Sequence, residues 1–331
     1  MTRRLAVLAH FNALGEVAPH VLRQLRMLNR SFDRVVVAST SPLSASAKAS
    51  MTAYADVVER SNLGQDFGSW HEVLEDSGLA RGFNEVLLTN DSYVSVIDDL
   101  EPVIAEMARR PVEMWGLTKT WRHAEHIQSY FVFLEEPVLR SQAFAQFWSD
   151  FRPAPDRTSA IMNQEVGLSS AMLSAGFRLG SYFEPTDAER RLANLRGVHW
   201  LLRRRRAFPA RFHGFGDHFH VRRAFDPAEA DNLNWATDFA DFVFDAARYP
   251  VVKFDTLRYD PHWLGSDRLL AACERAFPGQ FEGVRDYMTR TAHAYPGRPF
   301  ENNGPAILNP LTRLVVGYRP RKSRSARGSS R

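Results

Sequence analysis

The chain has 331 residues, 44% hydrophobic and 24% charged, which suits one or two globular domains, and its single cysteine excludes an intrachain disulfide. The formal charge of +4 comes from the tail, because removing the six basic residues from Arg319 onward leaves 36 of the 42 basic residues against 38 acidic ones. The near-neutral body argues against nucleic-acid binding, and no run reaches the roughly 18–20 apolar residues of a membrane helix, so we expect a cytoplasmic protein.

The first half of the chain alternates strand-like and helix-like segments. Strands are expected at residues 5–9, 35–38, 57–58 and 86–88, and helices at 17–28, 44–54, 67–74 and 97–107. This order predicts an α/β fold with a mostly parallel sheet and helices on both faces. Ligands of such sheets bind outside the carboxyl ends of the strands, which is where His10, Ser39, Arg60 and Asp91 fall.

The second half is expected to add strands at 114–116, 129–133 and 177–182 and helices at 141–151 and 163–175, the last closing on Gly176. From Arg190 the chain becomes basic, and later helical and aromatic. We therefore expect an α/β domain over 1–185, a basic and helical C-terminal region packing on it over 186–317, and a disordered basic tail over 318–331.

A polar, glycine-bearing loop follows the third expected strand. Asn62 is suited to a nucleobase or ribose, Gly64 lets the backbone approach a ligand closely, and Asp66 is suited to a ribose hydroxyl or a sugar. The alternative is a plain strand-to-helix connection in which Asp66 stabilises a helix N-terminus.

The fourth expected strand ends at Asn90-Asp91-Ser92. Asp91 is the candidate ligand for a divalent cation, Mg²⁺ or Mn²⁺, because hard cations often use one or two carboxylates together with phosphate oxygens. The alternative is a turn, since Asn, Asp and Ser all favour turns.

Several sequence blocks recur in one order along the chain and carry a family resemblance. They are Arg60-x-Asn62-x-Gly64-x-Asp66-Phe67-Gly68-x-Trp70, Leu88-x-Asn90-Asp91-Ser92, Trp115-Gly116-Leu117-Thr118, His126-x-Gln128-Ser129-Tyr130-Phe131, Glu165 through Gly176-Phe177, Asn232-Leu233-Asn234-Trp235 and Pro250-Val251-Val252-Lys253-Phe254. Together they resemble the rhamnan synthesis protein F family, glycosyltransferases of bacterial rhamnose-containing cell-surface polysaccharides. The resemblance runs from Leu5 to Pro261.

The resemblance implies a GT-A-like nucleotide-sugar-binding domain that transfers a sugar with inversion, L-rhamnose from dTDP-L-rhamnose, to a cell-surface polysaccharide or lipid-linked glycan. By similarity to inverting glycosyltransferases, Glu165 is the candidate general base. The alternative for Glu165 is a surface acid in the first turn of a helix. The donor would be held by His10, Ser39, Arg60, Asn62, Gly64, Asp66, Asn90, Asp91 and Ser92, and the acceptor or sugar pocket would be lined by Trp115, His126, Gln128 and Ser129.

One departure from the wider pattern leaves a second function open. Asn90 and Ser92 flank a lone Asp91 where an Asp-x-Asp motif is usual, so dependence on a cation is not implied. A non-catalytic nucleotide- or glycan-binding scaffold is therefore the alternative to an enzyme. The block Arg203–Arg206, beside Trp200, is either a solvated helix face or, with the tail, a peripheral contact with the inner face of the membrane.

Overall fold

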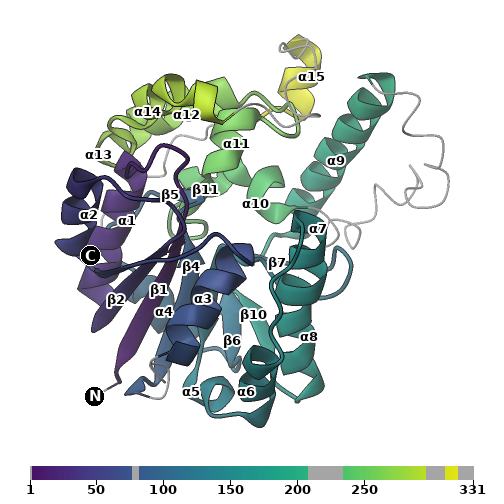
Figure 1. Ribbon diagram of the computed structural model, residues 1–331. Helices are drawn as coiled ribbons and strands as arrows, with labels where there is room; N and C mark the ends of the chain where they lie inside the picture. Colours follow the sequence, from purple (N-terminus) through teal and green to yellow (C-terminus); the bar gives the residue numbers. More distant parts are fainter. Residues whose placement is uncertain (1, 77–81, 208–233, 296–309, 320–331) are drawn as a thin grey trace, which may run out of the picture. The chain divides into compact units, whose positions relative to one another are not determined.

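The computed structural model describes residues 2–76, 82–207, 234–295 and 310–319 (Figure 1). The chain divides into two compact units. The first comprises Met1–Tyr93 and Asp98–Tyr182, and the second comprises Val94–Ile97 and Phe183–Arg331. The short segment Val94–Ile97 thus belongs to the second unit, although the residues before and after it in the sequence belong to the first.

A seven-stranded sheet forms the centre of the first unit, in the order β10-β6-β9-β4-β1-β2-β3. All neighbouring strands run parallel except β9, which is antiparallel to both β4 and β6. The strands are β1 (Arg4–His10), β2 (Arg34–Ser39), β3 (Asp56–Glu59), β4 (Glu85–Asn90), β6 (Met114–Gly116), β9 (Phe131–Leu134) and β10 (Leu179–Ser181). This arrangement confirms the α/β fold and the mostly parallel sheet.

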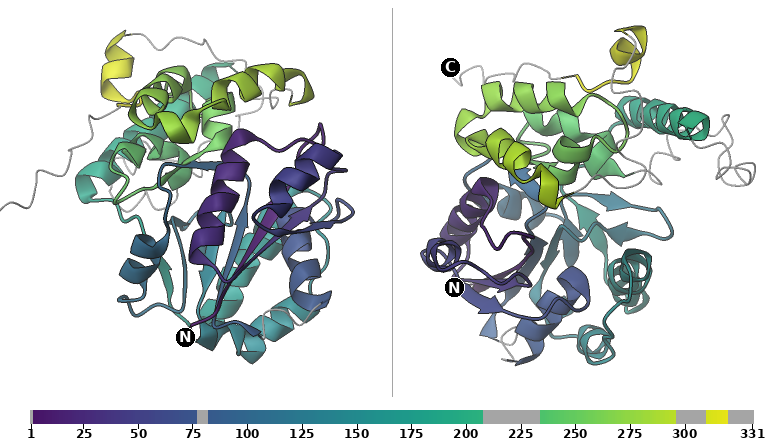
Figure 2. Two further views of the ribbon diagram at one scale, coloured as in Figure 1. Left: turned by 90° about the vertical axis from the view of Figure 1, so that its left-hand side faces the viewer. Right: turned by 45° about the horizontal axis from the view of Figure 1, so that its top comes forward.

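Helices cover both faces of this sheet, because its strands alternate apolar side chains to each side. One face packs Val7 and Leu88 against Phe67, Trp70 and Trp148, and the views of Figures 1 and 2 place α1 and α4 on the opposite face. The helical segments are α1 (Pro19–Ser31), α2 (Ala45–Thr52), α3 (Gln65–Asp76), α4 (Glu101–Met107), α5 (Glu136–Leu139), α6 (Gln142–Ser149), α7 (Arg157–Ala160), the π-helix η2 (Ile161–Glu165) and α8 (Val166–Ser174).

Local signals in the sequence set several of these helix ends. Ser44 and Ser141 cap α2 and α6 by accepting hydrogen bonds from Ala47 N (3.2 Å) and Phe144 N (3.1 Å). Gly176 ends α8 with φ of +90°, and Phe177 N donates to the Met172 carbonyl oxygen at 3.1 Å. This bond pattern is a helix-ending motif that a glycine favours, as the sequence predicted.

The strand register brings four chain segments to one edge of the sheet. His10 pairs with Ser39, and Ser39 with Glu59, while Ala9 pairs with Asn90. The antiparallel strand β9 pairs Phe131 with Thr89, so the residues just before Phe131 lie toward this same edge. A two-stranded ribbon of β7 (Lys119–Thr120) and β8 (His126–Ile127) lies between β6 and β9 in sequence.

The described part of the second unit is mainly helical, with one small sheet formed by β5 (Tyr93–Ser95) and β11 (Val251–Lys253). Val96 N donates to the Pro250 carbonyl oxygen at 2.9 Å beside this pairing. The helical segments are α9 (Asp187–Ala207), α10 (Trp235–Asp238), η6 (Ala240–Phe244), α11 (Phe254–Tyr259), α12 (Ser266–Ala276), α13 (Pro278–Phe281), α14 (Val284–Arg290), η7 (Ala292–Ala294) and α15 (Pro310–Val315).

A buried ion pair crosses the core of the second unit. Arg196 of α9 is fully buried and makes two 2.8 Å bonds to the carboxylate of Asp241. The Tyr318 hydroxyl donates to the Thr237 carbonyl oxygen at 2.8 Å, and Arg319 N donates to Asp241. The packed chain therefore extends past the expected start of the tail at 318, and residues 320–331 lie outside the described part. Within the described residues, none of the helices has the length and apolar character needed to cross a membrane.

Candidate active site

Arg60 shapes the loop between β3 and α3. Its guanidinium bonds Glu72 (2.7 Å), the Ser69 hydroxyl (3.2 Å) and the Leu63 carbonyl oxygen (2.7 Å), and its side chain is 5% exposed. Three partners inside the protein hold this cation in place, so Arg60 fixes the conformation of the loop. Asn62 lies exposed on that loop.

Gly64 gives this loop its sharp turn. Its φ is +76°, in the region that favours glycine, and a Cβ there would lie 3.1 Å from the ring of Phe151. The turn leads directly into α3, whose first residues include Asp66. Asp66 Oδ2 accepts a 2.7 Å hydrogen bond from the Asn90 amide, which ties the loop to the end of β4.

The Asn90-Asp91-Ser92 segment is held from several sides. The Asn90 carbonyl oxygen accepts from the Gln24 amide at 3.0 Å, and its side-chain oxygen accepts from Ser92 N at 3.1 Å. Asp91 Oδ2 accepts from Phe11 N at 2.9 Å, while the Asp91 carbonyl oxygen accepts from His20 Nε2 at 3.0 Å. The carboxylate of Asp91 thus lies next to the backbone of Phe11, which directly follows β1.

His10 and Ser39 end neighbouring strands and contact each other. His10 Nδ1 lies 3.0 Å from the Ser39 hydroxyl, and both residues are buried. Burial lowers the pKa of His10 to about 4, so the imidazole is neutral at pH 7. We refer to His10, Ser39, Asp66, Asn90 and Asp91 as the β1–β4 half of the site.

Glu165 meets the chain before β9. Its Oε2 accepts from Ser129 N at 2.7 Å, and its Oε1 lies 3.2 Å from His126 Nε2. His126 Nδ1 donates to the Ala124 carbonyl oxygen at 2.8 Å, since a carbonyl only accepts. His126 Nε2 therefore shares a further proton with the carboxylate. We refer to His126, Gln128, Ser129 and Glu165 as the β8–β9 half.

The electrostatics of this pair favour the charged forms. Burial alone would raise the pKa of Glu165, but the bonds from His126 and Ser129 outweigh it and hold that pKa below its ordinary value. Burial alone would lower the pKa of His126, but the hydrogen bond and charge of Glu165 outweigh it and raise that pKa. Glu165 closes a π-helical turn, a feature often found at functional sites.

Buried hydroxyls that the sequence analysis did not single out link the two halves. Thr89 Oγ1 donates to the Tyr130 carbonyl oxygen at 2.8 Å, and the Tyr130 hydroxyl lies 2.8 Å from Thr118 Oγ1. Thr118 Oγ1 in turn donates to Gln128 Oε1 at 2.7 Å. Thr118 and Tyr130 belong to the ordered sequence blocks and lie directly before β7 and β9, so polar side chains next to strands were the available signal.

Trp115 does not join the site. Its side chain is fully buried, its ring stacks on Phe133 with centroids 4.5 Å apart, and its indole N–H donates to Glu135 at 3.3 Å. The alternation along β6 and β9 places these rings in the core beneath one face of the sheet. The expectation that Trp115 lines a pocket is therefore corrected.

The donor set for a cation is small. Within the described residues, no group of three or more His, Cys, Asp or Glu side chains is placed to hold a metal. Asp91 suits a Mg²⁺ or Mn²⁺ ion that takes most of its ligands from a diphosphate, as such ions often do. It does not suit an ion held by the protein alone.

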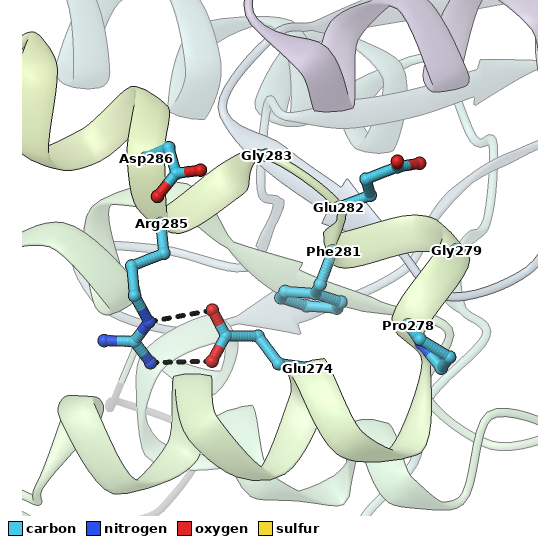
Figure 3. Close-up of a pocket in the computed structure, with 8 residues that line it drawn as sticks. All are labelled: Glu274, Pro278, Gly279, Phe281, Glu282, Gly283, Arg285 and Asp286. Carbon is cyan, nitrogen blue, oxygen red and sulfur yellow. Dashed lines mark hydrogen bonds and ion pairs between the residues drawn. The ribbon is translucent and has the colours of Figure 1, made fainter.

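Two cavities lie outside the two halves of the site. One, of about 570 Å³, lies in the second unit beside the ion pair of Glu274 and Arg285, with Phe281 on its wall (Figure 3). The other, of about 460 Å³, lies in the first unit beside α6. Neither is lined by a residue of the β1–β4 half or the β8–β9 half.

The basic block of α9 is only partly described. The Arg203 guanidinium lies 5.5 Å from the centre of the Trp263 ring, a cation–π contact within the second unit. The side chains of Arg204, Arg205 and Arg206 and the basic tail from 320 lie outside the described residues.

Comparison with known proteins supplies the family. Residues 35–199, about half of the chain, match the family described as rhamnan synthesis protein F. The match confirms the family expected from the ordered blocks. Over 144 residues, 42% of this chain and 38% of the relative, the chain is 26% identical to the uncharacterized protein y4gN of Sinorhizobium fredii. The chain thus spans well under half of that relative's length.

Solved structures show only distant likeness. With 15% identity and a TM-score of 0.34, 4-diphosphocytidyl-2C-methyl-D-erythritol synthase covers 55% of this chain and 89% of its own. Core-mannan synthase A from Aspergillus fumigatus, in its Mn/GDP form, is 8% identical with a TM-score of 0.33. The match covers 51% of this chain and 69% of the synthase. The glycosyltransferase GlyE of Streptococcus pneumoniae is 10% identical with a TM-score of 0.34. The match covers 75% of this chain and 66% of GlyE. At these TM-scores the likenesses carry no argument about this chain.

Proposed function

Residues 35–199 match the rhamnan synthesis protein F family, and from this premise we propose that the protein is an inverting glycosyltransferase. The donor is a nucleotide sugar, dTDP-L-rhamnose, and the acceptor is a bacterial cell-surface polysaccharide or lipid-linked glycan. The observation that carries the proposal is the Glu165 carboxylate, held by His126 and Ser129 just before β9, near the edge where β1, β2 and β4 end.

Each half of the site has a role in this reaction. Asp91, Asn90 and Asp66 lie at the strand ends, where nucleotides bind in α/β sheets. The loop fixed by Arg60 presents Asn62 and the backbone at Gly64. When bound, a divalent cation at Asp91 would neutralise the charge of the diphosphate leaving group.

Glu165 is the proposed general base. The acceptor oxygen bonds to the anomeric carbon from the face opposite the diphosphate, the bond from that carbon to the phosphate oxygen breaks, and the hydroxyl proton passes to Glu165. Because its pKa is held low, the carboxylate is ionised at neutral pH and ready to accept. His126 orients the carboxylate and is a positioning residue.

The test separates binding from chemistry. Glu165→Gln should bind dTDP as the parent does, by calorimetry, and lose about 10²–10⁴-fold in the rate of transfer or donor hydrolysis. Asp91→Asn should weaken dTDP binding in the presence of Mg²⁺. Glu106→Gln, on α4, is the control and should match the parent. Parental transfer by Glu165→Gln would refute the base, and absence of dTDP binding by the parent would refute the function.

One observation favours the second candidate, a non-catalytic scaffold. Both carboxylate oxygens of Glu165 already accept bonds from the protein, as they would in a purely structural role. Binding of dTDP without turnover of any sugar nucleotide, with Mg²⁺ or Mn²⁺ present, would select the scaffold.

We further propose that the basic segment Arg203–Arg206 and the tail contact an anionic membrane surface on the cytoplasmic side. Support comes from the sequence, where these cations stand beside Trp200, Leu201 and Leu202. Flotation with vesicles of neutral lipid, with and without anionic lipid, tests it. Recovery that does not depend on anionic lipid would contradict it.

A further inference from the structure

The cavity of about 460 Å³ in the first unit has a mixed wall. It lies where α6 packs against α8, and the residues that matter here are Gln146, Phe147, Asp150, Phe151, Asn163 and Gln164. Figure 1 shows α6 and α8 side by side. Its volume falls within the range of about 300–1,000 Å³ of small-molecule sites, which combine apolar walls with a few polar groups.

Gln164 gives this cavity an unusual feature. The residue is 2% exposed, and its side-chain nitrogen donates to the Arg152 carbonyl oxygen at 3.2 Å. Among the described residues, its Oε1 atom has no hydrogen-bond partner. A buried acceptor without a hydrogen bond destabilises the protein, so a hydroxyl donor that meets it would bind more tightly.

The remaining wall defines the chemical class of the ligand. Phe147 and Phe151 are partly buried and offer aromatic surface. Gln146 donates to Asp150 Oδ2 at 2.7 Å, which places an amide and a carboxylate on the rim. Aromatic surface suits the C–H face of a sugar ring, and amide and carboxylate oxygens suit its hydroxyls. Asp150 and Arg152 both line the cavity, so its wall carries one anion and one cation, which suits a ligand without net charge.

Two walls of the cavity are continuous with the candidate active site. The Phe151 ring lies 3.1 Å from where a Cβ of Gly64 would stand, so it packs on the glycine turn of the β3–α3 loop. Gln164 precedes Glu165 within the same π-helical turn. A ligand in the cavity would therefore contact Phe151, which packs on the loop proposed to hold the donor, and Gln164 of the turn that carries the proposed base.

We propose that this cavity binds a neutral hexose unit of the glycan acceptor, with Gln164 Oε1 accepting from a sugar hydroxyl and Phe147 and Phe151 supporting the ring. The inference rests on the proposed glycosyltransferase function. It adds a second acceptor subsite to the acceptor or sugar pocket expected at His126, Gln128 and Ser129.

The experiment uses saturation-transfer NMR on the full chain. The probes are the methyl glycosides of L-rhamnose, D-glucose, D-galactose and D-mannose, and dTDP with Mg²⁺ is measured separately. At least one glycoside should bind, and Gln164→Met should weaken it about tenfold, since the buried hydrogen bond is lost. The same variant should change the melting temperature little, because the loss of the Gln164 bond to the Arg152 carbonyl oxygen offsets the removal of the unpartnered Oε1 atom.

The controls separate this inference from the proposed function. Gln142→Met, an exposed change on the same helix α6, should bind glycoside as the parent does. If dTDP binds but no glycoside does, or if Gln164→Met binds glycosides as the parent does, the acceptor subsite is refuted while the function stands. If glycosides bind in the predicted manner but dTDP does not, the subsite stands and the donor assignment fails.

Discussion

His10 at the end of β1 and His126 in β8 are buried to the same degree, at 2% and 3% exposed, yet their pKa values move in opposite directions. His10 contacts a serine hydroxyl, and burial lowers its pKa to about 4. His126 contacts the carboxylate of Glu165, and its pKa rises despite burial. One neighbouring charge thus decides the protonation of a buried imidazole.

The comparison also separates the two halves of the site by chemistry. The β1–β4 half presents a neutral imidazole and the carboxylates of Asp66 and Asp91, which accept hydrogen bonds from the Asn90 amide and from Phe11 N, and this suits recognition of a ligand. The β8–β9 half holds a carboxylate and a shared proton, which suits proton transfer. Four changes would break or sharpen this contrast.

The largest effect is expected when the carboxylate is removed. Glu165→Ala leaves the buried His126 Nε2 and Ser129 N without their partner, and we expect a loss of about 3–5 kcal/mol in the free energy of unfolding. Urea unfolding followed by circular dichroism measures it. Glu165→Gln can still accept from Ser129 N and should lose only about 1 kcal/mol. A loss of about 1 kcal/mol or less in both variants would show that the carboxylate contributes no pairing.

The next effect concerns His10 in acid. The folded protein resists protonating His10 until pH is about 4, whereas the unfolded chain takes up the proton near pH 6.5. Stability is therefore lost as pH falls from 6.5 to 4, by about 3 kcal/mol from this residue. Unfolding curves at pH 7 and pH 4 should show His10→Asn losing less than the parent by that amount. An unchanged acid loss would place the sensitivity elsewhere.

A smaller effect of opposite sign is expected for His126. Its raised pKa stabilises the fold below pH 6.5, and this contribution is lost as pH rises through the higher pKa of the folded state. The parent should exceed His126→Gln by about 1–3 kcal/mol at pH 6, and the difference should shrink toward pH 9. The exposed His293→Gln serves as control. A difference that stays constant with pH would rule out an ion pair.

The smallest effect is expected at the glycine turn between β3 and α3. Gly64→Ala forces a side chain into φ of +76° and against Phe151, at a cost of about 1 kcal/mol. Gly279→Ala, whose Cβ would meet nothing within 4 Å, is the matched control. Thermal unfolding compares them, and equal melting temperatures would show that the loop relaxes freely.

The β1–β4 half could be foreseen because its residues follow strands of plain periodicity. His10, Ser39 and Asp91 end segments that read as buried strands, and the parallel register then brings them to one edge. The residues of the β8–β9 half could be identified from the ordered blocks, but their contacts with one another could not be predicted. Glu165 and Ser129 are far apart in sequence, and a π-helical turn and an antiparallel strand join them. Neither feature has a periodic signal.

Trp115 was expected in the site but lies in the core. It stands in an ordered block beside the residues of the site, yet it belongs to the aromatic stack with Phe131 and Phe133. The alternation of Phe131 and Phe133 already indicates one buried face in β9, but which strand lies beside β9 depends on long-range pairing. Membership of a sequence block therefore predicts the surroundings of a side chain less well than the face of the strand on which that side chain lies.

The pairing of β5 with β11 has a consequence for how the chain is made and cut. During synthesis β5 emerges long before its partner strand β11. The backbone groups of β5 therefore remain unpaired with β11 until the later part of the chain has been made. A fragment that stops at Tyr182 would keep β5 and lose β11, leaving an open strand edge that invites self-association. Separate production of the first unit would need residues 94–97 replaced by a short polar linker.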